Sequence, residues 1–184
     1  MITVGLDMSL SATGFARLDG DDIHVETIKT TTKTAPNDLV RIQHICREVM
    51  KRIPSNVEMI CIEDVFMPMS RATMGSAMNL IALQYPMRLA LYHAGYKFYV
   101  PAAGQLKKFA TGKGNCDKSI VVREVFKRWG VEAANDNEAD ATTLVYMAKR
   151  ILDTEGQFTW AKFQDDAIKK VLDERPRYNI VTTN

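Results

Sequence analysis

The sequence predicts an α/β fold in which helices flank a mixed five-stranded sheet, with an antiparallel hairpin first and parallel strands after it. Two observations carry this prediction. The first thirty residues read as β-rich runs separated by short turns, and the residues that follow alternate short apolar runs with segments of helical periodicity. A chain of 184 residues suits a single domain that buries a substantial core.

Composition limits the class of protein. The chain is 46% hydrophobic and 25% charged, which is ordinary for a globular protein. It contains no apolar run that approaches a membrane span and no basic, apolar leader, so we expect no membrane association. The three cysteines are odd in number and widely spaced, which favours reduced thiols in a cytoplasmic setting.

Three strands are expected at the start of the chain. They lie at residues 2–7, 13–19 and 23–30. The Gly20-Asp21-Asp22 turn between the second and third runs favours an antiparallel hairpin.

The middle of the chain alternates helix and strand. A helix is expected from Asp38, where apolar residues begin to recur at about 3.6-residue spacing, and Pro54 follows its end. Residues 59–63 then form a short strand that is buried on both faces. A long apolar helical segment follows at 67–95, and Pro86 within it should kink the helix or split it in two.

The remaining elements of the main domain are mostly helical. Residues 96–100 give a fifth strand, and a short helix and a glycine-containing loop follow it. Asp117 can cap the next helix, which runs to Trp129 and stops at Gly130. The last helix of the main domain spans roughly Asp136 to Leu152.

Two segments are therefore expected, a main domain at residues 1–152 and a C-terminal helical extension at 153–184. Apolar residues recur at helical spacing in the extension, which predicts an amphipathic helix that docks on the domain or on a partner.

Two carboxylates close predicted strands. Asp7 ends the first strand, on the face that it shares with Thr3 and Gly5. Glu63 ends the strand at 59–63, where Asp64 offers a second carboxylate. Ends of strands in α/β sheets are where sites usually form. A plainer interpretation makes Asp7 a turn residue that caps the following loop through its own side chain.

Two more carboxylates lie one turn apart at the start of the last main-domain helix. Asn135 can act as N-cap and Glu138 can reach back as in a capping box, and acids in the first turn suit the helix dipole. Capping therefore explains Asp136 nearly as well as a site does, whereas Asp140 lies in the second turn, on the face that points toward the protein body. Like charges at this spacing repel, so the pair indicates a cation site.

The four acids, if the fold gathers them, suit Mg²⁺, a hard ion that prefers oxygen ligands. Two ions in such a site, for which Mn²⁺ can substitute, activate an attacking water and stabilise the leaving oxygen of a phosphodiester. The three histidines have no ligand spacing with each other or with cysteine, which argues against zinc. The expected metal ligands are Asp7, Glu63, Asp136 and Asp140.

Positive charge is concentrated in one stretch. Between Gln105 and Arg128 seven basic residues stand against two acidic ones, giving +5 in a chain whose net charge is +2. A local basic stretch beside a carboxylate cluster suggests a polyanionic substrate, although a solvated helix face would look the same. The candidate DNA-binding residues within it are Lys107, Lys108, Lys113, Lys118 and Arg123.

Four motifs occur in a fixed order: GLDMSLSATGFA at 5–16, IEDVFM at 62–67, QLKKFATGKGNCDKS at 105–119, and DNEADA at 136–141. Together and at this spacing they resemble the RuvC family of Holliday junction resolvases, which have a ribonuclease H-like fold. The resemblance covers about residues 1–152. It is greatest to phage and mitochondrial members, which space the last two acids by four residues.

The resemblance implies a role for each matched position. The four acids would be catalytic metal ligands, and Lys107 and Lys118 would lie near the scissile phosphate, with Lys118 a catalytic residue. Phe66 would stack on opened bases at the junction centre, although a core phenylalanine would occur equally at a strand end. Bacterial members space the last acids by three residues, so Glu138 competes with Asp136 as a ligand.

The resemblance also implies a partner and an assembly. Family members are homodimers that make paired nicks in a four-way DNA junction, in the cytoplasm of a bacterial or phage-infected cell. A two-fold protein suits a quasi-symmetric substrate. Pro86 interrupts the helix expected at the dimer interface.

Three other functions stay open. A broader branched-DNA or flap nickase would share the fold and the site. A small actin-like-fold ATPase would also open with an Asp and a hairpin, but the chain is short for two lobes. A non-catalytic junction-binding protein would keep DNA affinity without cleavage.

Overall fold

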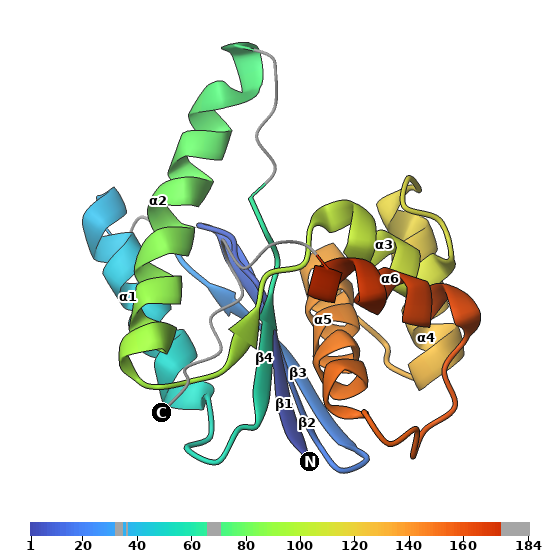
Figure 1. Cartoon of the computed structure of the whole chain (residues 1–184). Helices are drawn as coiled ribbons and strands as arrows, with labels where there is room; N and C mark the ends of the chain where they lie inside the picture. The colour runs from blue at the N-terminus through green and yellow to red at the C-terminus, as the bar shows by residue number, and fades with distance from the viewer. Residues whose placement is uncertain (32–34, 36, 66–70, 174–184) are drawn as a thin grey trace.

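The computed structural model describes residues 1–31, 35, 37–65 and 71–173 (Figure 1). Its elements are β1 Ile2–Asp7, β2 Ala12–Asp19, β3 Asp22–Lys29, α1 Asp38–Arg52, β4 Met59–Ile62, α2 Arg71–His93, β5 Phe98–Tyr99, α3 Ala103–Thr111, α4 Lys118–Trp129, α5 Asp136–Leu152 and α6 Lys162–Asp173. Within these residues, no helix is both long and apolar enough to cross a membrane.

The five strands form one mixed sheet, as predicted, in the order β3-β2-β1-β4-β5. β1 to β3 pair antiparallel, whereas β4 pairs parallel with both β1 and β5. The last strand is shorter than the predicted 96–100, and Pro101, which has no backbone N–H, follows soon after it. Because β1 and β4 run parallel, with Leu6 beside Ile62, the residues that follow them emerge at the same edge of the sheet.

Helices cover both faces of the sheet (Figure 1): α1 and α2 lie on one face and α3 to α6 on the other. Side chains of β1 alternate between the two faces of the sheet, as predicted, and so reach the cores on both sides. Val4 and Leu6 pack toward α1 and α2 in a cluster with Ile45, Val49 and Leu83. Thr3 faces the other way, where its hydroxyl donates a hydrogen bond to the Val145 carbonyl on α5.

Two glycines let α5 approach the sheet at backbone distance. A Cβ atom on Gly5 would lie within 3.0 Å of backbone atoms of Ala141 and Val145. One on Gly14 would lie equally close to the carbonyl of Asn137. Real Cβ atoms do not approach backbone this closely. Glycine at these two positions of β1 and β2 therefore allows α5 to pack directly against the sheet.

Of the two effects predicted for Pro86, a kink or a split, the split does not occur. α2 continues through Pro86 from Arg71 to His93. Proline leaves the carbonyl four residues before it without a helical donor. Here Pro86 and Ala82 both lie on the exposed side of α2, where water can satisfy that carbonyl.

Helix ends mostly follow the predicted caps. α1 and α5 begin and end close to their predicted limits, and α4 ends at Gly130, whose φ of 69° is left-handed. Asp117 occupies the N-cap position of α4, but its side chain makes no capping hydrogen bond, contrary to our expectation. The helix begins without that bond.

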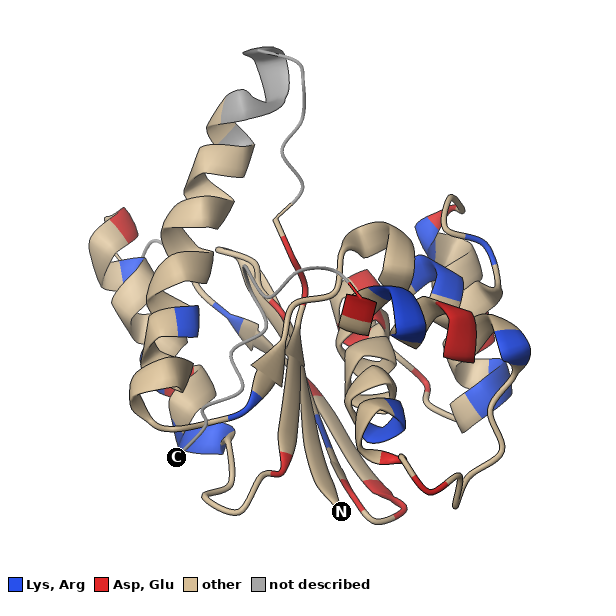
Figure 2. Ribbon diagram, in the orientation of Figure 1, with Lys and Arg blue, Asp and Glu red and all other residues tan. Residues whose placement is uncertain are grey.

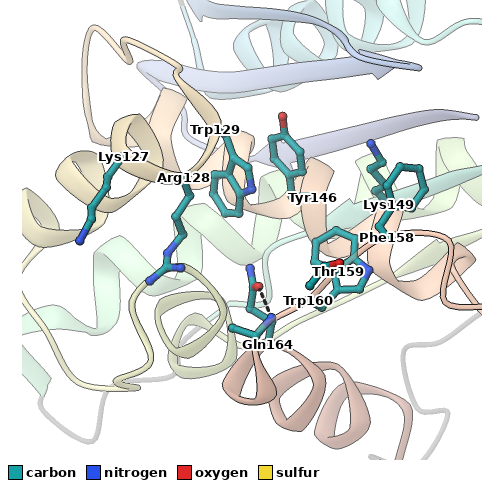
Figure 3. Close-up of a pocket in the computed structure, with 10 residues that line it drawn as sticks. Lys127, Arg128, Trp129, Tyr146, Lys149, Phe158, Thr159, Trp160 and Gln164 are labelled. Carbon is teal, nitrogen blue, oxygen red and sulfur yellow. Dashed lines mark hydrogen bonds between the residues drawn. The ribbon is translucent and has the colours of Figure 1, made fainter.

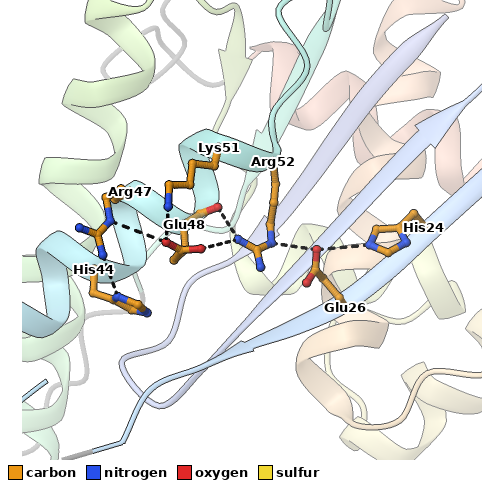
Figure 4. A network of polar contacts seen from close by, with 7 residues as sticks. All are labelled: His24, Glu26, His44, Arg47, Glu48, Lys51 and Arg52. Carbon is orange, nitrogen blue, oxygen red and sulfur yellow. Dashed lines mark hydrogen bonds and ion pairs between the residues drawn. The ribbon is translucent and has the colours of Figure 1, made fainter. Parts of the chain in front are cut away.

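A chain of ion pairs connects α1 to the edge strand β3 (Figure 4). The Arg52 guanidinium donates to Glu48 within α1 and, at 2.9 Å, to Glu26 on β3. His24 lies beyond Glu26 on the same strand, at 3.2 Å. This network joins α1 to the outer edge of the sheet.

The C-terminal extension contributes α6. Of the two predicted alternatives, docking on the domain or on a partner, the structure has the first: α6 packs against the main domain. Ala167, Ile168 and Val171 join the core cluster that contains Leu106 and Phe109 of α3. The segment before α6 adds Trp160, whose ring lies 5.9 Å from that of Phe109. The extension therefore completes the core on the α3 side.

Candidate active site

Asp7 and Glu63 meet at the edge of the sheet where β1 and β4 end. The Glu63 amide donates to the Leu6 carbonyl at 3.1 Å, which continues the parallel ladder up to this acid. The Asp7 side chain, 7% exposed, shares a hydrogen bond with that of Glu63. Burial raises the pKa of Asp7 to about 6. Burial, followed by repulsion from Asp7, raises the pKa of Glu63 well above its ordinary value.

Asp140 approaches the same point from α5. Burial, followed by repulsion from Asp7, raises its pKa to about 7. It also repels Glu63. Leu144 and Met147 continue its face of the helix and are fully buried, so this face points toward the protein body, as predicted. Three desolvated carboxylates thus gather here and oppose one another's ionisation.

Asp136 lies at the rim and is paired with a cation. The Lys118 ammonium, at the start of α4, donates a hydrogen bond to its carboxylate. This contact lowers the pKa of Asp136 and raises that of Lys118. Among the residues described, no group of three or more His, Cys, Asp or Glu side chains is arranged to hold a metal ion as it stands.

Glu138 serves the start of α5. Its Oε1 accepts a hydrogen bond from the Thr27 hydroxyl on β3 at 2.6 Å, and its Oε2 accepts from the Ala134 amide at 2.8 Å. The Asn135 side chain accepts from the Glu138 amide at 3.0 Å, as an N-cap residue does. Glu138 reaches back, as expected, although to the residue before the N-cap. Both carboxylate oxygens of Glu138 therefore accept hydrogen bonds that hold the start of α5.

A cleft of about 560 Å³ opens over the three gathered acids. The predicted site residues among its lining are Asp7, Glu63, Asp140, Lys107 and Lys118. Asp136 is not in the lining, and its neighbour Asn137 is. Ser9 and Asn79 also line it and were missed, because an isolated serine or asparagine in a turn or helix carries no sequence signal of its own.

The other predicted DNA-binding residues surround this cleft unevenly. Lys107 donates to the Cys116 carbonyl at 3.0 Å and so holds the glycine loop. Lys113 and Arg123 are exposed, Lys108 is half-buried, and none of the three lines the cleft. Several Lys and Arg residues lie on α3, α4 and the loop between them (Figure 2). Phe66 lies outside the described residues.

Comparison with known proteins decides the family. The model of the family described as crossover junction endodeoxyribonuclease RuvC matches residues 3–154. The chain belongs to the RuvC family. The predicted family and class of enzyme, a junction endonuclease, are confirmed, and enzymes of this family depend on divalent metal ions. The roles predicted for single residues stay predictions.

Two solved structures share the fold. The Thermus thermophilus RuvC structure has a TM-score of 0.59 and 20% identity, covering 79% of this chain and 91% of that one. T. thermophilus RuvC in complex with Holliday junction substrate has a TM-score of 0.60 and 20% identity, covering 79% and 90%. No curated protein sequence matches the chain.

A second cleft, of about 630 Å³, lies toward the other end of α5 (Figure 3). Trp129 and Tyr146 stack in it at 4.3 Å between ring centroids, and residues 158–161, beyond the RuvC match, close it. Arg128 there donates to Glu124 and Ala110, and Lys149 lies 3.8 Å from Asp21. Arg128 and Lys149 are thus already paired within the protein and the four predicted acids are absent from the lining, so we do not assign the active site to this cleft.

Proposed function

We propose that this RuvC-family protein resolves four-way DNA junctions by paired nicks, using a metal centre built on Asp7, Glu63 and Asp140, with Asp136 as the fourth ligand. One observation carries the assignment of the site. Three carboxylates from two strand ends and one helix meet in a cleft, and burial and mutual repulsion disfavour their charged forms. Such a cluster ionises fully when a cation binds. Working on DNA, the protein belongs in the cytoplasm of a bacterial or phage-infected cell.

The donor set fits Mg²⁺, with Mn²⁺ as a substitute, because every candidate ligand is a carboxylate oxygen. When bound, two such ions supply an activated water and stabilise the leaving oxygen of the phosphodiester. Asp136 joins the other three acids once Lys118 releases it. Until then, the ion pair with Lys118 keeps Asp136 apart from the other three acids.

Lys118 then has a second role. Its ammonium, on an exposed side chain at the rim of the cleft, can exchange the Asp136 carboxylate for a phosphate oxygen of the substrate. That exchange binds the phosphate and frees the ligand in one movement. Lys107 keeps the neighbouring loop in place through the Cys116 carbonyl.

Branched DNA is the proposed substrate. Lys107 and Lys118 line the cleft, and further basic residues lie on α3, α4 and the loop between them, which suits a phosphate backbone running across it. The structural neighbour solved in complex with Holliday junction substrate has the same fold. The basic residues support a DNA substrate, and the structural neighbour supports junction DNA over an unbranched duplex.

A homodimer through α2 is part of the proposal. The exposed side of this helix carries four large apolar side chains, Met78, Tyr85, Leu89 and Tyr92. Leu89→Glu is expected to shift the protein from dimer to monomer in sedimentation velocity. Leu172→Glu, at a similarly exposed leucine of α6, is the control and should stay dimeric (Leu89 is 55% and Leu172 48% exposed). A wild-type protein that sediments as a monomer would contradict the dimer.

The function is tested with a panel of DNA substrates in Mg²⁺. Wild type should cut a mobile four-way junction and leave Y, flap and linear duplexes largely intact. Asp140→Asn should bind the junction with unchanged affinity and fail to cut it, while Asp166→Asn on the exposed side of α6 should behave as wild type. Equal cutting of all substrates would replace the resolvase with a general branched-DNA nickase. Unchanged cleavage by Asp140→Asn would remove the acidic cluster from the active site.

A further inference from the structure

Two buried polar residues of α2 hold the end of β4 from behind. The Gln84 side chain is 1% exposed, and its Nε2 donates to the Glu63 carbonyl at 2.7 Å. Arg88, one turn further along and 8% exposed, donates from Nη2 to Asp64 Oδ1 at 2.9 Å and from Nε to Gln84 Oε1 at 3.2 Å. Glu63 and its neighbour are therefore both bonded to the same helix.

Gln84 and Arg88 are polar residues beside an apolar core, where nonpolar side chains would need no hydrogen-bond partners. Leu83 and Met87, adjacent to the two polar residues, are fully buried in the core under the sheet. A buried amide and a buried guanidinium are costly without hydrogen-bond partners, so their partners indicate what they do. Those partners are the backbone of one candidate metal ligand and the side chain that follows it.

The backbone at Glu63 needs such support because β4 ends one residue earlier, at Ile62. Its amide is bonded to Leu6, and its carbonyl receives the Gln84 donor. Asp64 is fixed in turn through its amide, which donates to the Pro101 carbonyl at 2.8 Å. With these bonds in place, the peptide planes on both sides of Glu63 are set.

We propose that Gln84, assisted by Arg88, is a positioning residue that orients the Glu63 carboxylate for metal binding. The inference rests on the proposed role of Glu63 and adds α2 to the machinery of the site. Removing a residue that hydrogen-bonds to a metal ligand typically lowers metal affinity or activity by about 10–100-fold. Displacement of a reacting group by about 1 Å has an effect of similar size.

The test compares Gln84→Met with wild type in single-turnover cleavage of a prebound four-way junction. Gln84→Met keeps the side-chain length and removes the donor to Glu63. We expect the cleavage rate to fall about 10–100-fold and the Mg²⁺ concentration for half-maximal rate to rise about 10-fold. The junction affinity measured in EDTA should not change, since the DNA surface is untouched.

Gln164→Met is the matched control. Gln164 is 6% exposed, and its Oε1 accepts from the Ala161 amide at 3.0 Å, on the far side of the domain in α6. It should lower the melting temperature as Gln84→Met does, with the rate and the Mg²⁺ dependence of wild type. Gln84→Glu keeps the acceptor for Arg88 but lacks the donor to Glu63, so we expect it to be as impaired as Gln84→Met.

Outcomes separate this inference from the proposed function. If Glu63→Gln is inactive while Gln84→Met matches wild type in rate and Mg²⁺ dependence, the positioning role is wrong and the function stands. Full activity of Gln84→Glu would also overturn it, because Arg88 alignment would then suffice. If Glu63→Gln itself cleaves normally, the proposed metal site fails. Should Gln84→Met not fold, Arg88→Lys decides: a raised Mg²⁺ requirement supports positioning, and an unchanged one refutes it.

Discussion

The backbone of Gly14 lies directly against the carbonyl of Asn137. A Cβ atom at residue 14 would come within 3.0 Å of that carbonyl, and backbone cannot move aside as a flexible side chain would. Gly14 is also the residue opposite Asp7 in the β1–β2 ladder. One missing side chain therefore sets the separation between Asp7 and the first turns of α5, which carry Asp136 and Asp140.

Gly14→Ala is expected to displace the start of α5 and impair the site. Overpacking of this kind costs about 1–3 kcal/mol of unfolding free energy. The cleavage rate should fall because Asp140 moves away from Asp7. Gly75→Ala in α2, where a Cβ meets nothing within 4 Å, should instead stabilise the protein slightly. Urea unfolding and junction cleavage measure both effects, and a Gly14→Ala protein with wild-type activity would contradict the close approach.

The metal-free protein should lose stability as pH rises from about 4 to about 7. Asp7 and Asp140 keep their protons to about pH 6 and 7 when folded, whereas in the unfolded chain they lose them near 3.8. The folded state thus binds more protons in this window, so their contribution is full below pH 4 and lost as pH rises. For Asp140 alone it is up to roughly 4 kcal/mol.

Urea unfolding in EDTA at pH 5 and pH 8 measures this dependence. Asp140→Asn has no such proton to lose, so the difference between the two pH values should shrink in that variant. Asp166→Asn is the control and should keep the wild-type difference. Mg²⁺ at pH 8 should stabilise wild type more than Asp140→Asn. Equal pH dependence in wild type and Asp140→Asn would count against the desolvated cluster.

Substitutions of Asp136 and of Glu138 should have different effects on cleavage and stability. Glu138→Gln leaves one oxygen for two donors, Thr27 and the Ala134 amide, and should reduce stability by about 1–2 kcal/mol. Cleavage by the folded variant should persist. Asp136→Asn should lower the cleavage rate strongly with little loss of stability, because its partner Lys118 is exposed. The reverse pattern in a cleavage assay would make Glu138 the ligand.

Junction binding should weaken steeply with salt, and the slope should depend on the basic stretch. Each phosphate contact contributes about 0.9 to the slope of log K against log salt. Lys113→Ala and Arg123→Ala, both at exposed positions, should each reduce the slope by about one. Lys51→Ala, on α1 across the sheet, is the control. If Lys113→Ala and Arg123→Ala keep the same slope as wild type and Lys51→Ala, DNA binds elsewhere.

The docking of α6 should contribute measurably to stability. Ile168 is nearly fully buried in the core that contains Leu106 and Phe109. Ile168→Ala should cost about 2–5 kcal/mol, as other large-to-small core substitutions do. Leu172→Ala on the exposed side of the same helix should cost much less. A melting temperature unchanged by Ile168→Ala would show that the extension is detached in solution.

Local patterns predicted much of this architecture. The period of two in β1 correctly separated Val4 and Leu6 from the face of Asp7, because a strand presents alternate residues to opposite sides. The start of α5 was equally predictable, since the Asn135 cap and the apolar stripe are encoded within the helix itself. These features need no knowledge of the rest of the fold.

Other features depend on how distant elements dock. Lys118 and Asp136 pair across two helices, and nothing in either segment specifies that contact. Gln84 was missed because a glutamine in an apolar helix reads as a surface residue until its neighbours across the core are known. That Pro86 would not split the helix was hidden for a related reason, since its effect depends on which side of α2 faces solvent.

The edges of the sheet have a consequence for association. β5 contributes only two residues at one edge, and the outer strand β3 carries charged or titratable side chains at Asp22, His24 and Glu26. Short or charged edge strands give a second sheet little to pair with, which protects against edge-to-edge aggregation. Among the strands that the structure describes, neither edge favours a β-ladder between two copies of this protein. Contact through helical surfaces is favoured instead, and a folding intermediate that exposes β1 or β4 would lack this protection.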